Sequence, residues 1–163
     1  MTEDLQRPHQ GLSVLNRLRH ESNRTEWAIC FPRLACIFRA GGTAFNVDAF
    51  VQSSSLDWDE VWHIGEVKAV RRAGRRNTSG VQKLIADGDN FDTLVAEAAA
   101  FLKAHSTGLA RVASTDGVEF ATFDFGLTWD PSHAARYVHL PAEMVKLAAA
   151  AGCSLEVSFY DLR

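Results

Sequence analysis

The stretch EFATFDFGLTWDP, residues 119–131, most constrains what this chain can fold into. Every second position from Ala121 to Trp129 is apolar, and the positions between them hold Thr, Asp, Gly and Thr. Because successive side chains of a strand point to opposite faces of a sheet, this alternation predicts a strand with one face in a core and one face outside it. One-sided strands of this kind are typical of antiparallel sheets that carry helices on one face.

Two further segments alternate in the same way. In RLACIFRAGG, residues 33–42, Leu34, Cys36 and Phe38 alternate with Arg33, Ala35 and Arg39. In SLEVSFY, residues 154–160, Leu155, Val157 and Phe159 are expected to point inward, and Glu156, Ser158 and Tyr160 outward. We also expect a strand over 59–70, its antiparallel return over 80–88, and a brief strand over 136–140.

Helical spacing and capping residues predict the helices. Asn46 is a good N-cap for a short helix, and Asn90 or Asp92 for a longer one over 91–105. A short helical segment follows at 107–114, and a last helix begins at Pro141 and stops at Gly152.

The resulting element order predicts the α+β class, with a mainly antiparallel sheet and helices packed on one face. A strand-helix-strand unit occurs over 33–68 and again over 118–160, which suggests a tandem ferredoxin-like pseudo-repeat.

The length of 163 residues, 47% of them hydrophobic, fits a single domain. We expect residues 1–26 to be a polar extension, partly helical or mobile, and residues 27–163 to be the α+β domain. The three cysteines include no CxxC pair, and Cys30 and Cys36 sit in apolar runs, as buried thiols of a reducing compartment do. With no signal-like or membrane-spanning apolar run, the expected location is the cytoplasm and no membrane partner is expected.

The stretch VKAVRRAGRRNTSG, residues 67–80, concentrates positive charge in a chain of net charge -3. It is expected to form the loop of a hairpin between the strands at 59–70 and 80–88. A sequence pI of about 6.0 argues against general nucleic-acid coating, so a nucleic-acid partner is not expected. The candidate binding residues are the five cations of this loop with an aromatic ring and an imidazole before it: Lys68, Arg71, Arg72, Arg75, Arg76, Trp62 and His63.

Three interpretations of this basic hairpin stay open. It can be a solvated structural loop whose side-chain stems cover apolar surface. It can contact an acidic protein partner. It can also bind phosphate, a nucleotide or another small anionic ligand, since stacking surfaces, guanidinium donors and an imidazole lie close together in sequence.

Asp124 is the weak catalytic candidate. A carboxylate in the middle of an aromatic-rich strand must face water or be paired. If the last strand lies alongside, Asp124 shares the outer face with Glu156 and Tyr160, and together they could perform acid-base chemistry. The alternative is the solvated face of a one-sided sheet. No HExxH, GxSxG, GxGxxG or P-loop pattern is present, so neither a metal nor a cofactor is predicted.

Four pieces of the chain resemble a bacterial family of small α+β domains of unknown function, over about residues 33–160: IFRAGGTAFNVDAF, VWHIGE, FLKAHSTGLARVASTDGVEFATFDFG and HLPAEMVKLAAAAGCSLEVSFY. The resemblance supports the fold, and no catalytic signature comes with it.

The expected function is therefore a non-enzymatic binding domain that recognises a protein or small anionic ligand through the basic hairpin, with an immunity-type role as one instance. The alternatives are a small hydrolase or isomerase on the outer sheet face, and weak nucleotide or nucleic-acid binding.

Overall fold

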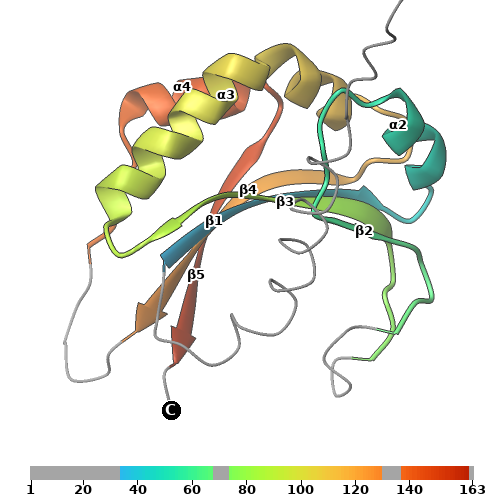
Figure 1. Cartoon of the computed structure of the whole chain (residues 1–163), viewed down its shortest axis with the longest axis horizontal. Coiled ribbons are helices and arrows are strands. Elements are labelled where there is room, and N and C mark those ends of the chain that lie inside the picture. The colour runs from blue at the N-terminus through green and yellow to red at the C-terminus, as the bar shows by residue number, and fades with distance from the viewer. Residues whose placement is uncertain (1–33, 68–73, 130–136, 162–163) are drawn as a thin grey trace, which may run out of the picture. The chain divides into compact units, whose positions relative to one another are not determined.

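A computed structural model describes residues 34–67, 74–129 and 137–161. These residues form one five-stranded sheet in the order β2-β3-β1-β4-β5 with three helices (Figure 1). The sheet is mostly antiparallel, which confirms the predicted α+β class. The strands and helices are β1 Leu34–Gly42, α2 Val47–Ser53, β2 Glu60–Trp62, β3 Ser79–Gly88, α3 Phe91–Ala113, β4 Phe120–Trp129, α4 Ala142–Ala150 and β5 Ser154–Asp161.

The first six elements have the ferredoxin-like β-α-β-β-α-β arrangement. The central strand β1 pairs antiparallel with β3 on one side and with β4 on the other, and β2 pairs antiparallel with β3. The remaining two elements, α4 and β5, extend this unit, because β5 pairs parallel with β4. The described residues therefore build one ferredoxin-like unit with an added helix and strand, in place of the tandem pair suggested by the sequence.

Alternation along β1 and β4 places the core on one face of the sheet. Cys36, Phe38, Phe123 and Phe125 are fully buried. Helices α3 and α4 lie over this face, and the buried residues of α3 belong to the same apolar cluster (Figure 1). The opposite face of the sheet, called here the outer face, carries the alternate positions of the same strands.

The helix boundaries follow the predicted caps. The side chain of Asn46 accepts a hydrogen bond from Ala49 N–H at 3.2 Å, and that of Asn90 accepts one from Thr93 N–H at 3.0 Å. Helix α3 is kinked at His105, whose backbone is not helical, so the two predicted helical segments are joined end to end. None of the described helices has the length and apolarity needed to cross a membrane.

Two predicted strands differ from the structure. In the described part of the strand expected over 59–70, β2 ends at Trp62, because a turn through Gly65, with φ of +86°, interrupts it; a single bridge between Val67 and Arg75 follows the turn. The brief strand expected over 136–140 is absent from residues 137–140. Val138 and Leu140 pack against the core cluster while Tyr137 is 95% exposed, so this segment reaches the core as the irregular lead into α4 without joining the sheet.

Parts of the predictions lie outside the described residues. These are the extension at 1–26, its boundary with the domain, and three of the five loop cations, Lys68, Arg71 and Arg72.

Candidate ligand-binding site on the outer sheet face

A row of two aromatic residues and two glycines crosses the outer face. Strand register places Trp62 opposite Gly80, Gly80 opposite Gly41, and Gly41 opposite Phe120. A Cβ on Gly80 would overlap the Trp62 indole, and a Cβ on Gly41 would lie 3.0 Å from the tip of the Phe120 ring. The two rings therefore cover glycine backbone from opposite ends of the row, and the glycines leave room for them.

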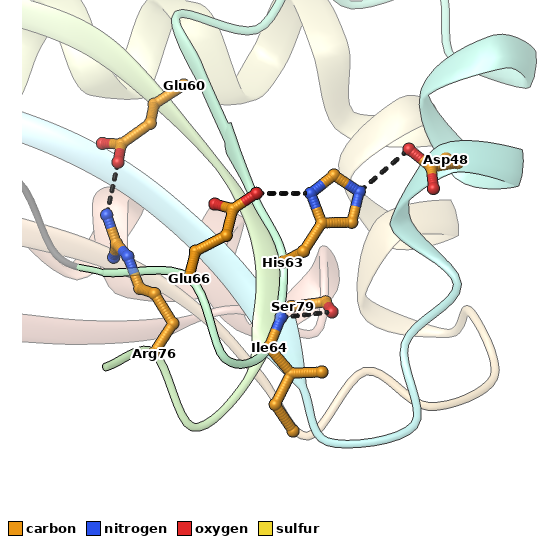
Figure 2. Close-up of polar contacts among 7 residues, drawn as sticks. All are labelled: Asp48, Glu60, His63, Ile64, Glu66, Arg76 and Ser79. Atoms are coloured by element: carbon orange, nitrogen blue, oxygen red, sulfur yellow. Dashed lines mark hydrogen bonds and ion pairs between the residues drawn. The ribbon is translucent and has the colours of Figure 1, made fainter.

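Trp62, a predicted binding residue, is almost fully covered, with 4% of its surface exposed. Its indole Nε1 has no hydrogen-bond partner among the described residues. The guanidinium carbon of Arg76 lies 4.6 Å from the centroid of its ring, at a distance typical of a cation–π contact. Arg76 also forms an ion pair with Glu60 on β2 (Figure 2). An aromatic ring and a carboxylate together therefore fix its orientation.

A second fixed arginine, Arg39, lies on β1. Its guanidinium forms an ion pair with Asp124 on β4, and the hydroxyl of Ser158 on β5 donates a hydrogen bond to the other carboxylate oxygen of Asp124 at 2.7 Å. Asp124 is 3% exposed, whereas Arg39 is 38% exposed. Asp124 is therefore a paired, buried carboxylate, which settles the choice posed by the sequence between pairing and facing water.

The other catalytic candidates lie on the same outer face. Glu156 is exposed and is the register partner of Asp124. Tyr160 lies over Gly126, where a Cβ would be 3.2 Å from its ring. The sequence thus predicted correctly that Asp124, Glu156 and Tyr160 share this face. It did not identify Arg39 as a site residue, because the only sequence signal for Arg39 was its outward position in the alternation of β1.

A groove of about 400 Å³ lies on the outer face, next to both arginines. It contains fixed cations, one exposed carboxylate and aromatic rings, and it reaches the end of the hairpin next to β3. Its lining consists of Arg39, Trp62, Arg76, Asn77, Thr78, Phe120, Thr122 and Glu156.

The neck of the hairpin is held by His63, another predicted binding residue. Its Nε2 lies 3.0 Å from an Asp48 carboxylate oxygen on α2, and its Nδ1 lies 2.9 Å from one of Glu66 (Figure 2). The hydrogen bond with Asp48 and, to a smaller extent, the hydrogen bond with Glu66 raise the pKa of His63 above its ordinary value. The backbone and then the side chain of His63 lower the pKa of Glu66. His63 thus joins α2 to the turn that follows β2.

Backbone bonds connect this turn to Arg76. The N–H of Gly65 donates to the carbonyl of Arg76 at 2.8 Å, and the N–H of Arg76 donates to that of Glu66 at 2.7 Å. Arg75 donates a side-chain hydrogen bond to the Gly65 carbonyl at 2.7 Å. The two described loop arginines therefore both stabilise the neck, and Arg76 also lines the groove.

Metal binding and cysteine catalysis have less support in the described residues. No group of three potential metal ligands occurs among them. Burial, and then the charge of Asp124, raises the pKa of the Cys36 thiol far above its ordinary range, and burial raises that of Cys153 to about 11. Both thiols are free and poorly suited to act as nucleophiles.

A search of protein-family models, curated proteins and solved structures finds no match to this chain. The resemblance to a bacterial family of small α+β domains therefore stays a prediction.

Proposed function

We propose that this protein is a non-enzymatic cytoplasmic binding domain that recognises a small ligand carrying an anionic group in the groove on its outer sheet face. The observation that carries the proposal is the presence of two oriented guanidinium groups, of Arg39 and Arg76, in one groove. Ligand sites combine a concave surface with a few precisely oriented polar groups. Arg76 belongs to the basic hairpin, so the hairpin supplies one of the proposed binding residues of this groove.

Fixing these side chains before binding favours affinity. A free arginine loses side-chain freedom when it binds an anion, and this loss weakens the complex. Here the Trp62 ring and Glu60 hold Arg76, while Asp124 holds Arg39. An arriving carboxylate or phosphate would therefore meet donors that are already oriented.

The enzymatic alternative, in which Asp124 acts as the base, has less support from the geometry. Each oxygen of the Asp124 carboxylate accepts one hydrogen bond, from Arg39 and from Ser158 respectively. Asp124 is also only 3% exposed, so a substrate in the groove has little access to it. We therefore assign Asp124 a role in positioning Arg39.

Nuclear magnetic resonance can test the proposal. Benzoate and inorganic phosphate, titrated into the isotope-labelled protein, are expected to shift the backbone amides of groove residues such as Thr78 and Phe120. Thr122→Trp should fill the groove and abolish these shifts. Thr107→Trp, on an exposed position of α3, is the matched control and should leave them intact. Shifts confined to other surfaces would contradict the proposal, and capture of an acidic protein through the hairpin alone would favour the protein-partner alternative.

A further inference from the structure

The charged residues of the groove differ in how they are paired. Arg39 and Arg76 each have a carboxylate partner, Asp124 and Glu60 respectively. Glu156 is exposed and forms no ion pair with any described residue. Among the described residues that line the groove, Glu156 is thus the carboxylate left to a cation.

The two guanidinium groups keep donors available to an anion. A guanidinium has five N–H donors in a fixed plane. The described carboxylate contact of Arg39 and of Arg76 is made through one terminal nitrogen in each case. Each arginine can therefore bind a second oxygen acceptor without giving up its present partner.

The register of β4 and β5 brings the opposite charges near each other. Glu156 is the direct strand neighbour of Asp124, and Asp124 holds the Arg39 guanidinium. Neighbouring strands lie about 4.8 Å apart. Thr122, whose side chain is smaller than those of Arg39 and Glu156, lines the groove with them. A ligand that lies over Thr122 therefore meets a cation and an anion a short distance apart.

An apolar surface borders the charged residues. Phe120, two residues before Thr122 on the same face of β4, is 37% exposed and lines the groove. An exposed aromatic ring beside a concave polar site favours an apolar group on the ligand.

We propose that the groove binds a small zwitterion, a free α-amino acid with an apolar side chain. Its carboxylate binds the guanidinium groups of Arg39 and Arg76, its ammonium binds Glu156, and its side chain packs on Phe120. This inference rests on the proposed function and specifies the ligand of the same groove.

The balance of charge favours a zwitterion over a simple anion. The two arginines are accompanied by three carboxylates, Glu60, Asp124 and Glu156. A ligand with only negative charge gains from the arginines but is repelled by Glu156, whereas an amino acid satisfies both signs.

Isothermal titration calorimetry with three matched probes tests the inference. Phenylalanine carries both charges, N-acetylphenylalanine lacks the ammonium, and phenylalaninamide lacks the carboxylate. Phenylalanine is expected to bind at least about tenfold more tightly than either derivative, because a charged hydrogen bond in a partly exposed site contributes at the lower end of its usual range.

Single substitutions should remove these preferences separately. Glu156→Gln should abolish the preference for phenylalanine over N-acetylphenylalanine. Arg76→Gln should reduce its preference over phenylalaninamide. Arg111→Gln, an exposed arginine of α3, is the control and should change neither. Circular dichroism checks that each variant is folded. Arg39 is not substituted, because its loss would leave the buried carboxylate of Asp124 without its ion-pair partner.

Two results would overturn the inference, and they are distinguishable. Equal affinity for phenylalanine and N-acetylphenylalanine, with groove amides still shifted by benzoate, refutes the zwitterion and leaves the proposed function standing. Failure of benzoate, phosphate and all three probes to bind refutes both.

Discussion

Replacing His63 with Gln should remove a pH-dependent part of the stability of the fold. A neutral imidazole has one N–H donor, yet both ring nitrogens of His63 face carboxylate oxygens, at 3.0 and 2.9 Å. Both contacts are favourable together only when the ring is protonated. The geometry therefore stabilises the imidazolium, in agreement with the raised pKa.

The sign of the effect follows from this raised pKa. The stabilisation is fully present below the pKa of the unfolded chain, about 6.5, and is lost as the pH rises through the higher pKa of the folded state. Each ion pair at this separation is worth about 1.4 kcal/mol by Coulomb's law in bulk water. His63 is 44% exposed, and exposed pairs typically retain less than about 1 kcal/mol. We expect about 0.5–1 kcal/mol for the whole contribution.

Urea denaturation at pH 5.5 and pH 8.5 measures this contribution. The free energy of unfolding of the wild-type protein should fall between these pH values by about 0.5–1 kcal/mol more than that of His63→Gln. The comparison cancels the other histidines, which both proteins share. An identical pH dependence in the two proteins would refute the reasoning, as would a His63 pKa below 6.5 in a magnetic resonance titration.

Two other substitutions test the outer face by denaturation. Asp124→Asn should lower the free energy of unfolding by about 2 kcal/mol, because the partly buried charge of Arg39 loses its partner; an unchanged midpoint would contradict this pairing. Gly80→Ala should cost more than about 2 kcal/mol because its Cβ overlaps the indole above it and a neighbouring carbonyl, whereas Gly65→Ala, which meets no atom within 4 Å, should cost only about 1 kcal/mol for its positive φ. Equal losses for the two glycines would argue against the close packing on Gly80.

Local patterns predicted most of the strands and helices. The alternation of β1 and β4 needs only the period of a strand and one buried face, so the inward and outward positions could be assigned without knowing the neighbours. The caps at Asn46 and Asn90 are equally local, since each side chain bonds an amide three residues ahead.

The candidate site depended on long-range pairing, which no local pattern reports. The groove exists because β2, β3, β1 and β4 place Trp62, Gly80, Gly41 and Phe120 in one row. In the sequence these residues are spread over four separate segments. The role of Arg39 likewise required the register of β1 against β4, and the parallel direction of β5 determined which residue meets Asp124.

If the groove binds a ligand as proposed, the place of β5 at one edge of the sheet couples that binding to the integrity of the edge. This strand supplies Ser158, which bonds Asp124, and Glu156, which lines the groove. If β5 detached from β4, the remaining strands would keep both arginines but lose the carboxylate for the ammonium. A frayed molecule that lacks only the Glu156 contact would still bind the ligand, but about tenfold more weakly. At one hundred times the dissociation constant of the closed form, the ligand would then hold this edge closed by about 1.3 kcal/mol, and the fraction of molecules with a frayed edge would fall about ninefold.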